Sequence, residues 1–119
     1  MPRLLSVSLT EQAVIDRSKT VTRRLGWWRD KHDRPLIVPG DHLVLCRKVM
    51  GRKPDEPLVR LAEVEVVRIN REPLLAISWA DCVREGFPAM QPSEFVEFFT
   101  QAMKCEPTTI VTRIEWRYL

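Results

Sequence analysis

Residues 58–69, which read LVRLAEVEVVRI, say most about the fold of this chain. Glu63 and Glu65 alternate with Val64 and Val66, so charged and apolar side chains would point to opposite faces of an extended backbone. This alternation predicts a long strand with one face toward a core and the other toward solvent.

A second strand precedes this one along the chain. Pro39, Gly40 and Asp41 form a turn, after which residues 43–50 begin with alternating leucines. Residues 51–57 are charged and rich in turn formers. The two strands are therefore expected to pair as a hairpin.

The N-terminal third combines three kinds of local structure. Residues 4–9 are apolar with partial alternation, which predicts the first strand. Thr10 is placed as the N-cap of a short helix over residues 11–16. Residues 26–39 hold one Gly, two Trp and two Pro without a helical or strand period, so we expect a loop there.

Two helices are predicted in the C-terminal half. Ser78 and Asp81 have the spacing of a capping box, and Gly86 is placed at the end of that helix. Residues 92–94 suit the first turn of the next helix, in which the apolar positions of residues 95–103 recur at helical spacing. The aromatic stripe on that helix predicts a face buried against a sheet rather than a ligand site.

A β-branched run over residues 108–118 supplies the closing strand. The order of elements, without a repeat or a linker, predicts a single α+β domain over residues 1–119. A small β-barrel with short helices packed at its ends would remove exposed sheet edges. Strand order is not visible in a sequence, so sheets other than a barrel stay open as alternatives.

The positive charge is concentrated in one segment. Residues 17–34 hold seven Lys or Arg against Asp30 and Asp33, a local balance of +5 in a chain whose net charge is +3. Such a cluster attracts phosphate groups, and RNA is one partner that would supply them. The alternative is a solvated basic loop without a partner.

Several classes of protein are not indicated. No apolar run approaches the roughly 18 residues that cross a bilayer, and the start, MPRLLSVSLT, lacks the features of a signal peptide, so we expect a cytoplasmic protein without membrane contact. Cys46, Cys82 and Cys105 include no CxxC pair and are expected to be free thiols packed in the interior. His42 and these cysteines lack the spacing of a zinc site, and no metal or cofactor is expected.

Three segments carry a resemblance to a known family. RSKTVTRR at residues 17–24, PGDHLVL at residues 39–45 and WADCVREGFP at residues 79–88 resemble the ASCH domain family, and the resemblance spans nearly the whole chain. It implies a PUA-like fold, a β-barrel with helices. It also implies an RNA- or nucleoside-binding cleft around Lys19 and its neighbours in the first segment.

The family signature G-x-K-x-x-E-x-R can be placed on the first segment. Lys19 and Arg24 match its lysine and arginine, which face the cleft in the family. Arg17 stands at the glycine and Thr22 at the glutamate. The expected cleft is therefore lined by Lys19, Thr22 and Arg24.

The K-T-x-T pattern resembles a subgroup of small ASCH proteins that are amidohydrolases acting on N-acylated cytidine. That resemblance implies Lys19, Thr22 and Glu85 as the catalytic group. A threonine hydroxyl needs a base to take its proton, and a lysine can serve if burial or nearby cations such as Arg23 lower its pKa. Lys19 and Thr22 are three residues apart, so a turn or bulge is required for both to reach one substrate.

Function therefore stays open between a binding domain, an amidohydrolase and, as a third variant, a ribonuclease. Residues expected to contact RNA or a modified nucleoside are Arg17, Arg23, Arg24, Trp27 and Trp28. Trp27 or Trp28 is expected to line the mouth of the cleft together with Arg24, where its ring could stack on an unpaired base. The alternative is that one of them plugs the end of the barrel. Trp79 and Trp116 lie in regular elements and are expected in the core.

Overall fold

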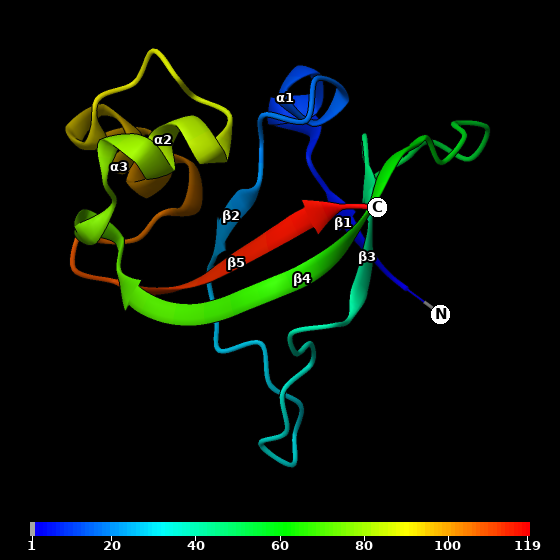
Figure 1. Cartoon of the computed structure of the whole chain (residues 1–119), viewed down its shortest axis with the longest axis horizontal. Coiled ribbons are helices and arrows are strands. Elements are labelled where there is room, and N and C mark those ends of the chain that lie inside the picture. Colours follow the sequence, from blue (N-terminus) through cyan, green and yellow to red (C-terminus); the bar gives the residue numbers. More distant parts are fainter. Residues whose placement is uncertain (1) are drawn as a thin grey trace.

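The computed structural model describes residues 2–119 and shows a curled sheet with the two C-terminal helices together at one side and the N-terminal helix apart from them (Figure 1). The strands are β1 (Arg3–Ser6), β2 (Val21–Arg24), β3 (His42–Cys46), β4 (Arg60–Pro73) and β5 (Ile110–Tyr118). The helices are α1 (Glu11–Ile15), α2 (Trp79–Glu85) and α3 (Pro92–Met103), with the short 3-10 turns η1 (Ser8–Thr10) and η2 (Leu74–Ala76).

The sheet has the order β1-β3-β4-β5-β2, with β1 parallel to β3 and every other pair antiparallel. The α+β class, the PUA-like barrel curvature and the β3–β4 hairpin are confirmed. The sheet stops at a half-barrel, because within residues 2–119 no ladder joins its edges β1 and β2. Instead, Arg24 Nη2 on β2 donates a hydrogen bond to the Ser6 carbonyl of β1 at 2.6 Å.

β4 is the strand that makes the sheet curl. Its residues 60–65 pair with β3 and its residues 64–73 pair with β5. The register with β5 shifts between Val66 and Arg68, where the alternation of the sequence is interrupted. A bulge of this kind bends a strand and increases its twist. The strand predicted over residues 58–69 therefore continues to Pro73, because the register with β5 resumes beyond the bulge.

The core consists of two apolar clusters, one inside the half-barrel and one beneath α3. Trp116 is buried in the first, as predicted, but the expectation for Trp79 is wrong: this side chain is 61% exposed at the first position of α2. On α3, Phe95 and Phe99 are buried, whereas Met103 is 45% exposed. The predicted buried stripe is thus correct for the first turns of α3 and wrong for its end.

Both ends of α2 were correctly predicted. Ser78 Oγ accepts a hydrogen bond from the Asp81 backbone N–H at 3.1 Å, and Gly86 ends the helix with φ of 99°. The Asp81 carboxylate does not complete a capping box, because it binds arginine side chains of the interior instead. Thr10 precedes α1 at the N-cap position, but its hydroxyl donates to the Val7 carbonyl rather than capping the helix.

Two sequence-based expectations concern the thiols and the membrane. Cys46 and Cys82 are free and buried, and Cys105 is free and half-buried. No helix within residues 2–119 combines the length and the apolar character needed to cross a membrane.

Candidate functional site

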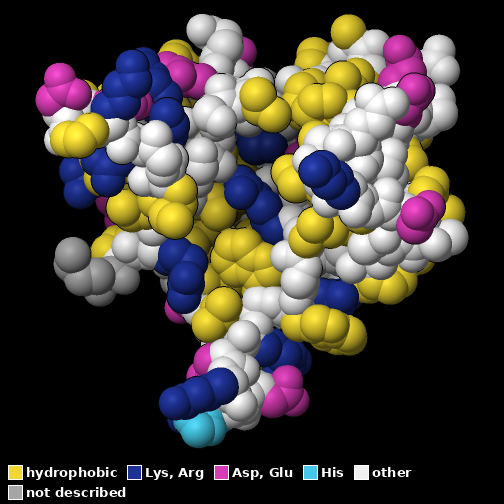
Figure 2. Space-filling model, turned by 180° about the vertical axis from the view of Figure 1, so that it is seen from behind, with side chains coloured by type: hydrophobic (Ala, Val, Ile, Leu, Met, Phe, Trp, Pro, Cys, Tyr) yellow, Lys and Arg dark blue, Asp and Glu magenta, His cyan; other side chains and the backbone are white. Residues whose placement is uncertain are grey.

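A cavity of about 190 Å³ lies between the helical side of the molecule and the N-terminal segment. Figure 2 shows a hollow on this face, with Lys or Arg side chains at its floor and hydrophobic side chains around it. Its polar lining includes Lys19, Thr22, Arg23, Arg24 and Glu85. The structure therefore brings together the three residues expected to be catalytic.

Lys19 and Thr22 reach the same cavity because only Thr22 lies in β2. Arg17 leaves α1 in a left-handed conformation with φ of 66°, and the Lys19 N–H donates to the Ala13 carbonyl at 3.0 Å. Lys19 therefore lies in the turn before the strand, where strand alternation does not apply. The bend that the spacing required is present.

The Lys19 side chain is buried and held by two oxygens of one residue. Its Nζ donates to the Glu85 carbonyl at 2.7 Å and to Glu85 Oε1 at 3.3 Å. Burial lowers the pKa of Lys19, Glu85 opposes the shift, and the positive charges of Arg24 and Arg23 add to the lowering. The net direction is downward, which favours a neutral amine more than in an exposed lysine.

Thr22 and Arg24 are adjacent on the same face of β2, two residues apart. Arg24 Nε donates to Thr22 Oγ1 at 3.1 Å, while its Nη2 holds the carbonyl of Ser6. Burial lowers the pKa of Arg24, but the guanidinium remains charged at physiological pH. The Thr22 hydroxyl thus has a fixed cation beside its oxygen.

Glu85, the last residue of α2, is fixed from both sides. Lys19 binds its Oε1, and Arg23 Nη1 donates to its Oε2 at 3.2 Å. Glu85 and Lys19 therefore form a buried ion pair whose second carboxylate oxygen is held by another cation.

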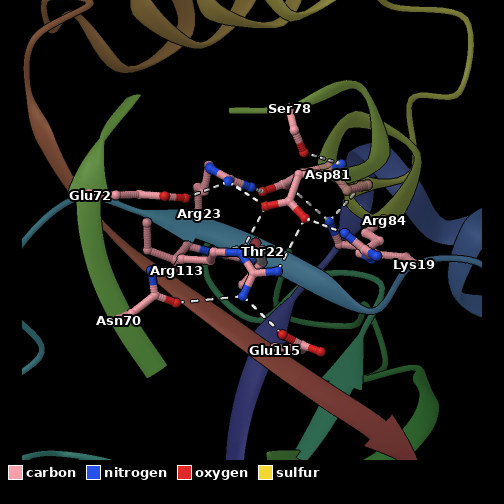
Figure 3. Close-up of polar contacts among 12 residues, drawn as sticks. Lys19, Thr22, Arg23, Asn70, Glu72, Ser78, Asp81, Arg84, Arg113 and Glu115 are labelled. Carbon is pink, nitrogen blue, oxygen red and sulfur yellow. Dashed lines mark hydrogen bonds and ion pairs between the residues drawn. The ribbon is translucent and has the colours of Figure 1, made fainter. Parts of the chain in front are cut away.

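Arg23 belongs to a buried network of charges that continues away from the cavity (Figure 3). Its Nη2 donates to Glu72 Oε1 at 2.6 Å and to the Asp81 carboxylate, which also accepts from Arg113 Nε at 2.8 Å. Burial raises the pKa of Asp81, but hydrogen bonds from Arg113, Arg23 and Arg84 outweigh it and hold this pKa well below its usual range. Arg23 is thus engaged with carboxylates, which does not suit the predicted contact with phosphates.

The apolar lining of the cavity comes mostly from α3 and was not anticipated from the sequence. It includes Phe87, Phe95, Phe98, Phe99 and Met103. A usable signal was the Phe98–Phe99 pair: adjacent side chains lie about 100° apart on a helix, so this aromatic face is wider than a single buried stripe.

The two tryptophans lie at a different place. Trp27 and Trp28 line a second cavity of about 250 Å³ beyond the other end of β2, so the expectation that one of them lines the mouth of the Lys19 cavity is wrong. The reason is that β2 ends at Arg24 and the loop that follows carries both tryptophans away from the Lys19 cavity. Trp28 packs against the core, while Trp27 is 65% exposed and its ring covers the Arg71 guanidinium at 3.6 Å.

The basic segment does not form one positive surface. Lys19 and Arg23 are buried, whereas Arg29 and Arg34 in the exposed loop pair with Asp33 and Asp30. The Arg17 guanidinium lies over the ring of Tyr118 at 5.4 Å, outside the Lys19 cavity. Within residues 2–119 no group of His, Cys, Asp or Glu has the arrangement of a metal site.

No family model matches the sequence, and no curated protein matches it either. Solved structures do match the fold. A protein of Enterococcus faecalis V583 described under the family model DUF984 superposes with a TM-score of 0.71 at 15% identity, covering 100% of this chain and 80% of its own.

Two structures described as ASCH domains are also similar. The one from Lactobacillus crispatus JV V101 has a TM-score of 0.65 at 10% identity, covering 98% of this chain and 79% of its own. The one from Zymomonas mobilis has a TM-score of 0.57 at 16% identity, covering 96% of this chain and 65% of its own. The chain, a curled five-stranded sheet with three short helices, therefore has the fold of solved ASCH domains.

Proposed function

We propose that this protein is an amidohydrolase that removes an acyl group from the exocyclic amine of a modified cytidine. The observation that carries the proposal is the convergence of Lys19, Thr22 and Glu85 on one cavity, with Arg24 beside the Thr22 hydroxyl. A nucleophile, a base of lowered pKa and a fixed cation are the groups that acyl transfer requires.

In the first half of the reaction, Thr22 Oγ1 bonds to the amide carbonyl carbon and its proton passes to the neutral Lys19 amine. Arg24, which already donates to Thr22 Oγ1, stabilises the negative charge that develops on the carbonyl oxygen of the substrate. The carbon–nitrogen bond then breaks. The exocyclic nitrogen takes the proton from Lys19 and leaves as cytidine, so that the acyl group remains as an ester on Thr22.

In the second half, a water molecule attacks the ester carbonyl and gives a proton to Lys19. The carbon–oxygen bond to Thr22 breaks, Lys19 gives its proton to the leaving Thr22 oxygen, and the carboxylic acid is released. Glu85 holds the Lys19 ammonium whenever the amine carries a proton, because its carboxylate is ion-paired to Nζ and fixed by Arg23. Its role is to position and stabilise the base through both steps.

The test is hydrolysis of N-acetylcytidine followed by chromatography of cytidine and acetate. Thr22→Ala is expected to lower kcat by at least about a hundredfold, while the equilibrium affinity for the substrate changes little, since a missing nucleophile removes chemistry rather than binding. Thr20→Ala is the matched control, because Thr20 is in the same segment but does not line the cavity. Full activity of Thr22→Ala would refute the catalytic assignment.

A second candidate function is binding of single-stranded RNA at a different surface. The observation that favours it is the exposed ring of Trp27, whose centroid lies 3.6 Å from the Arg71 guanidinium carbon. Arg71 Nη1 donates to the Gly26 carbonyl and to Thr112 Oγ1, each at 2.7 Å, so the support beneath the ring is fixed. An aromatic ring with one free face can stack on an unpaired base.

A further inference from the structure

The Lys19 cavity has one polar end and one apolar wall. Lys19, Thr22, Arg24 and Glu85 come from the segment before β2, from β2 and from the end of α2. The wall comes from α3 and Phe87, whose ring lies 5.3 Å from that of Phe98. Figure 1 shows α2 and α3 on one side of β2 and α1 with the N-terminal segment on the other. The cavity is lined by residues of both sides, residues 6–10 and the α3 phenylalanines.

The mouth of the cavity carries apolar side chains that solvent still reaches. Leu9 in η1 is 71% exposed, and Met103 at the end of α3 is 45% exposed. Both line the cavity, Leu9 from η1 and Met103 from α3. An apolar group that entered between them would remove their surface from water, which is favourable in proportion to the area covered.

An amide substrate has two sides, and only one of them suits this wall. The nucleoside side carries ribose hydroxyls and ring nitrogens, which are costly to bury without hydrogen-bond partners. Phe87, Phe98 and Met103 offer none. A hydrocarbon acyl group needs no such partners and gains from contact with these side chains.

Resting on the proposed amidohydrolase function, we infer that the substrate is a cytidine whose acyl group is apolar and longer than acetyl, seated against Phe98, Met103 and Leu9. The carbonyl carbon then lies at the polar end, near Thr22 Oγ1, and the ribose faces the solvent. These three side chains determine which acyl group is preferred, while Lys19, Thr22 and Glu85 carry out the chemistry.

The experiment compares kcat/KM for N-acetyl-, N-butanoyl- and N-hexanoylcytidine with the full chain. Each buried methylene contributes about 0.8 kcal/mol, or roughly fourfold, and butanoyl has two more than acetyl, so its kcat/KM is expected to be higher by about fifteenfold. Leu9→Ser and Met103→Ser are expected to lower the butanoyl-to-acetyl ratio severalfold. Met50→Ser is the control and should keep the ratio, because Met50 is 84% exposed and lies outside the cavity.

The outcomes separate this inference from the proposed function. If acylcytidines are hydrolysed but the rate is flat or falls with acyl length, the acyl-binding wall is refuted and the amidohydrolase function stands. That result would place the pyrimidine ring on the phenylalanines instead. If none of the acylcytidines is hydrolysed, both proposals are overturned.

Discussion

Residues of the same charge in one short segment have different environments in this protein. Lys19 lies at the cavity against Glu85, Arg23 is enclosed by carboxylates, and Arg24 bridges the two edge strands. Their roles therefore differ, although each is a cation within six positions of the others. Lys19 is the one whose protonation state the proposed chemistry uses.

The direction of the Lys19 shift predicts a pH dependence. A neutral amine is the base, so kcat/KM should rise with pH through a Lys19 pKa that burial holds below the ordinary lysine value of about 10.4. The positive charges of Arg24 and Arg23 lower the pKa of Lys19, whereas Glu85 raises it. Arg24→Gln removes one of the two lowering charges. The rising limb of the residual activity should then move to higher pH, as measured by kcat/KM from pH 6 to pH 10.

Arg29→Gln is the control for this profile, because Arg29 belongs to the same basic segment but lies outside the Lys19 cavity. Its profile should superimpose on that of the unaltered protein. A limb that moves equally in both variants, or in neither, would show that Arg24 does not tune the base.

At the scale of elements, the short helix α2 positions the site. Asp81 and Glu85 are four residues apart, so they project from the same face of α2, and both bind Arg23 of β2. The helix can be this short because its ends are fixed by Ser78 and by Gly86. Its C-terminal end also packs on the N-terminal segment, where a Cβ at Gly86 would come within 3.0 Å of Ala13 and Thr10 side-chain atoms.

Gly86→Ala should therefore destabilise the fold and disturb the site together. A left-handed conformation costs a non-glycine residue roughly 1–2 kcal/mol, and the contacts with Ala13 and Thr10 add to this cost. Gly40→Ala is a matched control: its φ of 97° is nearly the same, but no atom of residues 2–119 lies within 4 Å of its Cβ position. Urea unfolding should show a larger loss for Gly86→Ala, and equal losses would mean that packing at Gly86 contributes nothing.

At the scale of the whole molecule, the structure separates two surfaces that adjoin in the sequence. The Lys19 cavity lies between the helices and the N-terminal segment, whereas Trp27 and Arg71 lie beyond the other end of β2. A nucleoside in the cavity and a base stacked on Trp27 would therefore be bound independently. The two candidate functions can be tested apart for this reason.

Trp27→Ala is expected to weaken binding of a short single-stranded RNA by about 1–3 kcal/mol, the usual contribution of one base stacked on an aromatic ring. Trp79→Ala is the control, since Trp79 is about as exposed but lies on α2, and no Lys or Arg of residues 2–119 lies over its ring. Fluorescence titration at two salt concentrations would measure both affinities, and binding should weaken with salt. Equal effects of the two variants on RNA affinity would show that Trp27 does not stack on the RNA.

The sequence by itself determined most of the elements, though not the strand β2, and it determined the catalytic candidates. Alternation in β4, helical spacing in α3 and the residues at both ends of α2 are local patterns, and local patterns fix local backbone. The K-T-x-T segment likewise singled out Lys19 and Thr22, because the pattern that resembles a known family lies within four consecutive residues.

Only the tertiary structure decided which of these residues meet. The burial of Arg23 among Glu72, Asp81 and Glu85 depends on contacts between residues at least 49 positions apart. Strand order and the open edge of the half-barrel likewise depend on how separate segments pair, which no local pattern encodes. For the same reason the α3 phenylalanines were assigned wholly to the core and Trp27 to the wrong cavity. Helical spacing shows which side chains share a face, but what covers that face depends on how distant segments pack.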